Sequence, residues 1–223
     1  MPRWPRCGVP RVTESALANV DTPQNRLIFT LVVVVMVGAL FYYVIRAWRR
    51  RTEYRRLENS IIAVGSEHVR NVLVPDGMGA VMHIDYLLLT SRGVLAIDLR
   101  DVRGNIFGGD QMTEWTVMNG ASRTTFQNPQ HALYDRVAAV RALCGDLPVE
   151  GRILFTRRGK FPKGLPRWTL MVDSLRQEFP PVDSEAAHSW IGRYREGWNV
   201  LTAAVSPSPL RRRRGFLAQV FAE

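Results

Sequence analysis

The chain has 223 residues, of which 22% are charged and 46% hydrophobic, and its formal net charge is +10. This composition excludes a disordered polyelectrolyte and fits one ordinary domain with an anchor better than two full domains. Residues 1–51 carry a net charge of +6, residues 52–209 about +1 and residues 210–223 +3. Because the excess charge flanks the expected domain, it is weak evidence for nucleic-acid binding.

An apolar stretch near the N-terminus predicts a single membrane-spanning helix. Leu27 to Ile45 contains nineteen residues without a charge, and as a helix it is about 28 Å long, close to the hydrocarbon thickness of a bilayer. A signal peptide is the main alternative, but an arginine run follows where a cleavage site is expected. A buried core helix is the other alternative, and so long an uncharged stretch disfavours it.

The arginines around this stretch predict its orientation. Within about fifteen residues before the apolar stretch, Arg26 is the one positive residue. Six arginines follow the stretch: Arg46, Arg49, Arg50, Arg51, Arg55 and Arg56. The positive-inside rule then puts the N-terminus outside and the large domain in the cytoplasm, which predicts a single-pass protein of the cell inner membrane. The arginine run would also contact anionic membrane lipid.

The chain therefore divides into five expected segments. They are an extracytoplasmic arm (1–26), a transmembrane helix (27–48), a basic juxtamembrane linker (49–59), a folded domain (60–205) and a basic tail (206–223). Arg211 to Arg214 and the apolar residues after them fit either a membrane-surface helix or a frayed solubilising tail.

Within the domain, strands alternate with helices, which predicts an α/β or α+β fold. A helix continues from the anchor, and Gly65 separates it from a second helix expected to begin near Ser66. Residues 102–109 are expected to form a loop. The remaining expected elements are strands at 79–83, 84–90, 94–100, 114–118, 152–156 and 169–172, and helices at 130–143 and 184–204, with Pro129 and Ser184 at the helix starts.

Two acidic residues inside apolar strands are the unusual feature of this domain. Residues 84–90 and 94–100 form an expected hairpin, in which Asp85 opens the first strand and Asp98 lies near the end of the second, so that both acids are at the open end. A turn centred near Arg92 places Asp85 opposite residue 98 or residue 99, and only the first register brings the two acids onto one face. Arg100 shares the face of Asp98, while Leu95, Ile97 and Leu99 take the opposite one.

In that register the cluster suits a divalent metal ion. Buried carboxylates repel each other unless a cation neutralises them, and Mg²⁺ is commonly held by one or two carboxylates together with water and substrate phosphate. Glu67, at the start of the expected second helix, would be a third carboxylate. The alternative is structural: an Asp–Arg pair at the strand ends.

Several short motifs follow one another in a distinctive order between roughly residues 60 and 180. They are Gly65-Ser66-Glu67, Ile84 to Leu89, Gly93 to Arg100, Arg103 to Gly108, Trp115, Asn128-Pro129 and Ile153 to Thr156. In this order they resemble the nuclease-related domain (NERD) family of the PD-(D/E)XK restriction-endonuclease-like superfamily.

The resemblance implies an α/β, restriction-endonuclease-like core, a mixed sheet flanked by helices, after one transmembrane helix. It also implies Mg²⁺-dependent phosphodiester cleavage, with Glu67, Asp85 and Asp98 as metal ligands and Arg100 as the fourth residue of the catalytic site. Here Asp98-Leu99-Arg100 replaces the family's Glu-x-Lys. Arginine stays protonated and is a poor proton acceptor. Ala132 stands where the family often has glutamine, and Gln130 is the nearest substitute.

Other chemistries find little support. The cysteines Cys7 and Cys144 and the four histidines show no zinc-type spacing, and no serine is linked to a base. Trp115, Trp168, Trp190 and Trp198 fit core or interface packing better than base stacking.

Two functions are expected from the sequence. The first is a membrane-tethered, Mg²⁺-dependent nuclease acting on DNA or RNA. The second is a catalytically degenerate relative that serves as a binding or scaffolding module at the membrane. An unrelated membrane protein with structural acids is a third reading.

Overall fold

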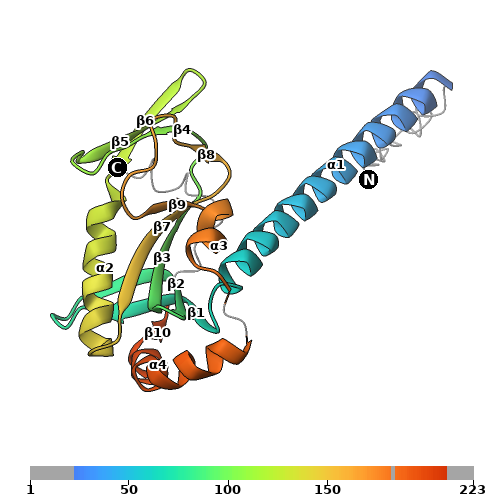
Figure 1. The fold of residues 1–223 in the computed structure, drawn as a ribbon. Coiled ribbons are helices and arrows are strands. Elements are labelled where there is room, and N and C mark those ends of the chain that lie inside the picture. The colour runs from blue at the N-terminus through green and yellow to red at the C-terminus, as the bar shows by residue number, and fades with distance from the viewer. Residues whose placement is uncertain (1–22, 182–183, 210–223) are drawn as a thin grey trace, which may run out of the picture. The chain divides into compact units, whose positions relative to one another are not determined.

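The computed structural model describes residues 23–181 and 184–209 and separates into two compact units, Met1–Tyr54 and Arg55–Glu223. The long helix α1 (Pro23–Ile62) begins in the first unit and ends in the second (Figure 1). Most of the expected N-terminal arm and tail lie outside the described residues.

Helix α1 runs on through the arginine-rich juxtamembrane segment to Ile62, as expected of a helix that continues from the apolar stretch. The stretch from Arg26 to Ile62 is long and apolar enough to cross a membrane, and the apolar side chains from Leu27 to Val44 are largely exposed. Within the second unit, its last turns bury Ile61 against the sheet. The apolar helix expected near the N-terminus is therefore present.

The helix expected to begin near Ser66 is wrong. Residues Glu67–Pro75 form strand β1, which pairs antiparallel with β2 (Val81–Thr90) from Glu67↔Leu89 to Pro75↔Val81. The physical reason is alternation: Val72 and Val74 are buried while the residues between and before them are more exposed, which is the period of a strand. Spacing over so few residues did not distinguish the two periods.

The expected hairpin is confirmed. Strand β2 turns through Ser91 and Arg92 into β3 (Gly93–Arg100), with Thr90 opposite Gly93 and Tyr86 opposite Ile97. The two-residue turn therefore sets the register, and continuing it by one pair puts Asp85 opposite Asp98. Gly93 takes φ +111, and a Cβ there would lie 2.2 Å from the carbonyl oxygen of Pro148, so only glycine fits.

The large sheet is buried on both faces, with strand order β10-β1-β2-β3-β7-β9. Helix α2 (Pro129–Cys144) is the crossover between β3 and the parallel strand β7 (Val149–Phe155), and β9 (Thr169–Met171) extends the sheet. One face packs on α2 and on α4 (Ser184–Ala204). The other packs on the end of α1 and on α3 (Leu175–Glu178), which follows a short 3-10 turn at Val172–Ser174.

Apolar residues from alternate positions of β3 fill both layers: Val94 and Ala96 on the α2 face, Leu95, Ile97 and Leu99 on the other. The short strand β10 (Ser206–Pro207) forms the edge beside β1.

A second, smaller sheet has the order β6-β5-β4-β8. Its strands are β4 (Gly104–Phe107), β5 (Glu114–Asn119), β6 (Ser122–Gln127) and β8 (Gly159–Lys160). The expectation of a loop across residues 102–109 missed β4, whose four residues carry Gly and Asn and too few apolar side chains to signal a strand. Both sheets contain parallel and antiparallel pairs, so the expected α/β class, a mixed sheet flanked by helices, is confirmed.

Candidate functional site

Asp85 and Asp98 lie side by side on the face of the sheet that α2 covers. Continuing the hairpin register by one pair beyond Tyr86↔Ile97 puts the two aspartates opposite each other, so their side chains share a face. Both are buried, with 8% and 3% of their surface exposed. The Leu99 amide donates to Asp85 Oδ2 at 2.8 Å, which stabilises a charge that burial would otherwise disfavour.

Two guanidinium groups hold the Asp98 carboxylate. Arg100 donates to Asp98 Oδ2 from Nε at 3.1 Å and from Nη2 at 2.7 Å. Arg136, from helix α2, donates to the same oxygen from Nη1 at 2.9 Å. The arginine side chains are 15% and 20% exposed, so this ion-pair cluster sits just below the surface.

Sequence reasoning did not find Arg136. The signal was available: Leu133, Val137 and Val140 form the buried stripe of α2, and Arg136 lies three residues after one of them and four before another. That spacing places Arg136 on the side of the helix that meets the sheet. What could not be read from the sequence was that Asp98 lies underneath it.

His83 also lies beside Asp85, although the spacing of the histidines in the sequence indicated no role for it. It is two residues before Asp85 on β2, and its Nδ1 is 4.0 Å from Asp85 Oδ1. Its Nε2 is 2.7 Å from Asn71 Oδ1 of the neighbouring strand β1. Asn71 has a φ of +54, an uncommon conformation that asparagine tolerates better than most residues.

The structure does not bring Glu67 to this pair. Glu67 begins β1 opposite Leu89, four residues along β2 from Asp85, which corresponds to about 13 Å. Its carboxylate instead meets α4: Arg195 Nη2 is 2.8 Å from Oε1, and Trp198 Nε1 donates to Oε2 at 2.9 Å.

As arranged, these residues do not fit a resident Mg²⁺ ion. Among the described residues, no group of three or more His, Cys, Asp or Glu side chains is placed to hold a metal. Two adjacent carboxylates are enough in number, but Asp98 is already neutralised by Arg100 and Arg136. A metal on that carboxylate would have to displace at least one guanidinium.

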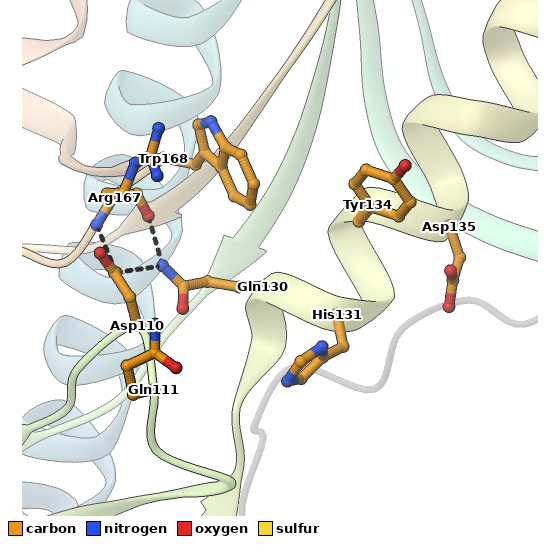
Figure 2. A pocket seen from close by; sticks show the side chains of 8 residues that line it. All are labelled: Asp110, Gln111, Gln130, His131, Tyr134, Asp135, Arg167 and Trp168. Atoms are coloured by element: carbon orange, nitrogen blue, oxygen red, sulfur yellow. Dashed lines mark hydrogen bonds between the residues drawn. The ribbon is translucent and has the colours of Figure 1, made fainter.

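A cavity of about 450 Å³ opens at the start of α2, between the loop before β5 and the loop before β9 (Figure 2). Its lining residues are Asp110, Gln111, Gln130, His131, Tyr134, Asp135, Arg167 and Trp168. Asn128 begins the helix as its N-cap, with Oδ1 accepting from the Gln130 amide at 2.9 Å. The expected helix start at Asn128-Pro129 is confirmed.

Gln130 joins the two loops that form one wall of this cavity. It is buried, and its Nε2 donates to Asp110 Oδ1 and to the Arg167 carbonyl, each at 2.8 Å. The Arg167 amide donates to the same Asp110 oxygen at 2.9 Å. The hydrogen bond from Gln130, followed by the one from Arg167, lowers the pKa of Asp110 from its ordinary value.

Comparison with known proteins finds a family match over part of this chain. Residues 47–156 match the family described as "Nuclease-related domain". An uncharacterized protein of Bacillus anthracis is 28% identical over 75 residues, which are 34% of this chain and 35% of that protein. The chain thus matches about a third of that relative's length. No solved structure matches.

Proposed function

Because this chain carries a nuclease-related domain over residues 47–156, we propose that it is a membrane-anchored module that binds the phosphate backbone of DNA or RNA without cutting it. The observation that carries this proposal is the buried Asp98 carboxylate, held by Arg100 and Arg136 at 2.7 and 2.9 Å. The acid occupies a position where a nuclease would hold a metal, and here it orients two arginines.

Two guanidiniums held by one carboxylate suit phosphate recognition. Arginine presents a planar set of donors that matches phosphate oxygens, and its charge persists at any physiological pH. Asp98 fixes both groups, so less side-chain entropy is lost when a phosphate binds. For the same reason Arg100 is poorly suited to accept a proton from water, which favours binding over hydrolysis.

A second candidate function is Mg²⁺-dependent cleavage by a restriction-endonuclease-like site. It is favoured by the adjacent, buried carboxylates of Asp85 and Asp98. In that function Asp85 and Asp98 would hold the ion and Arg100 would contact phosphate or water. Glu67 would join them only after leaving Arg195 and Trp198.

Membrane attachment through α1 supports both functions. Its apolar part is long enough to span a bilayer, and the arginines that follow it in the sequence would face anionic lipid headgroups. The arginine asymmetry favours the inner membrane with the domain on the cytoplasmic side, where both nucleic acid and Mg²⁺ are available.

A binding and cleavage assay on the full chain in detergent separates the two candidates. Labelled single- and double-stranded DNA and RNA would be titrated in EDTA and in Mg²⁺, with gel analysis of the products. We expect binding in EDTA and no cleavage in Mg²⁺. Arg136→Ala should bind more weakly, and the slope of its log binding constant against log salt concentration should be smaller by about one counterion. Arg176→Ala, an exposed arginine on α3, is the matched control and should bind as the unmodified chain does.

Cleavage that requires Mg²⁺ and is lost in Asp98→Ala would support the second candidate in place of the first. Arg100→Lys refines the comparison, because cleavage gained by that variant alone would indicate a nuclease site altered at one position. Equal binding by Arg136→Ala and Arg176→Ala would contradict the proposed arginine contact.

A further inference from the structure

The cavity at the start of α2 is lined by three rings that no other part of the proposed function uses. Trp168 and Tyr134 are 42% and 63% exposed, and His131 is exposed on the same helix as Tyr134. Figure 2 shows the Trp168 indole lying between Arg167 and the helix, with Tyr134 and His131 projecting from α2 around the same space. At about 450 Å³ the cavity is within the usual size range of small-ligand sites.

Trp168 is held at the surface by its backbone. Its φ is +57, which is rare and costly for a large residue. Hydrogen bonds fix this conformation on both sides: the Ile153 amide donates to the Trp168 carbonyl at 2.7 Å, and Gln130 binds the preceding carbonyl of Arg167. By contrast, Trp115 and Trp198 are buried in the core. Of the two expected roles for Trp168, core packing is therefore wrong, and interface packing stays a prediction.

The charge of the lining indicates which part of a nucleic acid would enter. Asp110 and Asp135 outnumber Arg167, so the cavity is on balance negative and disfavours a phosphate. A nucleobase is neutral and planar, and it can stack on an indole or phenol ring. Asp135 is exposed at the rim, where its carboxylate can accept from an exocyclic amino group.

The cavity lies near the arginine pair. Asp98 is aligned with Ile153 on β7, and Ile153 with Thr169 on β9. Trp168 directly precedes Thr169, which lies two strands away from Asp98, and two strand spacings correspond to about 10 Å. Helix α2 connects the two places, because it carries Gln130, His131 and Tyr134 at the cavity and Arg136 at Asp98.

We propose that this cavity binds one unpaired base of a single-stranded nucleic acid, stacked on Trp168, while the neighbouring backbone contacts Arg100 and Arg136. The base must be unpaired because both faces of a base in a duplex are already stacked. This inference rests on the proposed function and gives it a preference for single strands.

Fluorescence anisotropy of labelled oligonucleotides with the full chain in detergent tests the proposal. The probes are a single-stranded oligonucleotide, the same length in duplex form, and a single strand of abasic residues that keeps the phosphates. We expect Trp168→Ala to weaken binding to the normal single strand by about 5- to 100-fold and to leave binding to the abasic strand unchanged. Trp190→Ala, which removes an equally exposed indole on α4, is the control and should change neither.

Two further measurements keep the outcome clear. Thermal unfolding would reveal whether Trp168→Ala unfolds the loop. Tyr134→Ala changes an exposed helical position that accepts alanine readily, so this variant should stay folded. Because it removes a ring from the cavity, we expect it to weaken binding to the normal single strand. If the unmodified chain binds the normal and the abasic single strand, and Trp168→Ala and Tyr134→Ala bind both as tightly as Trp190→Ala does, the base site is refuted and the phosphate-binding function stands. If the unmodified chain binds neither strand, the proposed function itself fails.

Discussion

At the scale of single residues, the central feature is a carboxylate inside a sheet that is buried on both faces. A charge in such a place is costly unless it is paired and hydrogen-bonded. Arg100 and Arg136 provide that pairing for Asp98, and the Leu99 amide provides a hydrogen bond for Asp85. An arginine at position 100 therefore differs from a lysine in more than proton transfer. Its fork contacts Asp98 through two nitrogens, which a lysine ammonium cannot reproduce.

Gln130→Ala should loosen the wall of the cavity. The variant removes donors to Asp110 and to the Arg167 carbonyl from a buried position, and we expect a loss of about 1–3 kcal/mol in the free energy of unfolding. The pKa of Asp110 should rise toward its ordinary value of 3.8, because Gln130 is the largest cause of its lowering. Carboxyl NMR titration and thermal unfolding measure the two effects, with the exposed Gln177→Ala as control.

The pH dependence has a definite sign. A carboxyl whose pKa is lowered by folding stabilises the folded state above its unfolded pKa, and this contribution disappears as the pH falls through the lower folded value. The loop contact at Asp110 should therefore weaken below about pH 4, and Gln130→Ala should reduce that dependence. An Asp110 pKa unaffected by the substitution would contradict the assigned role of Gln130.

At the scale of elements, helix α2 and the β2–β3 hairpin assemble the site. One helix contributes Gln130 to the cavity and Arg136 to Asp98, and its apolar stripe fixes its rotation on the sheet. The hairpin turn determines whether Asp85 meets Asp98 at all, since a shift by one residue would turn one of the two acids to the opposite face. The register therefore depends on Gly93 and the two residues before it.

Gly93→Ala should destabilise the domain severely. The added Cβ would lie 2.2 Å from the Pro148 carbonyl oxygen, and φ +111 is unfavourable for any L side chain. We expect a loss of at least about 3 kcal/mol in the free energy of unfolding. Gly120→Ala is a matched control, because Gly120 also has a positive φ, +62, but no atom within 4 Å of the added Cβ. It should cost only about 1–2 kcal/mol, and equal losses in denaturant titrations would contradict the role assigned to Pro148.

At the scale of the whole molecule, the proposed membrane attachment raises the question of which side of the membrane the domain faces. The arginine asymmetry around α1 predicts an outside N-terminus, and the two cysteines of the chain allow a direct test. Cys144 is buried, and burial raises its pKa to about 11, so its thiol is largely unreactive at neutral pH. Cys7 lies in the expected extracytoplasmic arm, outside the described residues.

A membrane-impermeant maleimide should label the chain on intact spheroplasts, and Cys7→Ser should abolish that labelling. The same reagent applied after permeabilisation should give no additional signal, because Cys144 stays protected. Labelling that appears only after permeabilisation would place Cys7 inside and reverse the predicted orientation.

Much of this fold could be predicted locally. Apolar length alone indicated the helix of α1, alternating and continuous apolar runs indicated β2, β3, β5 and β7, and Asn128-Pro129 marked the start of α2. Strands β4, β6, β8 and β10 were missed, and β1 was taken for a helix, because hydrophobic period is ambiguous over a few residues. Pairing with β2 decided β1, and pairing with β5 decided β4.

The sequence by itself determined the apolar helix near the N-terminus, the charge asymmetry around it and the presence of acids within apolar strands, since each depends on neighbours along the chain. Only the tertiary structure decided that Arg136 reaches Asp98, that Glu67 turns to α4, and that Trp168 is held at a cavity instead of in the core. These contacts join residues 38, 131 and 15 positions apart, counting Trp168 to Ile153 for the last. Local pattern carries no information about partners at such separations, because chain packing alone brings them together.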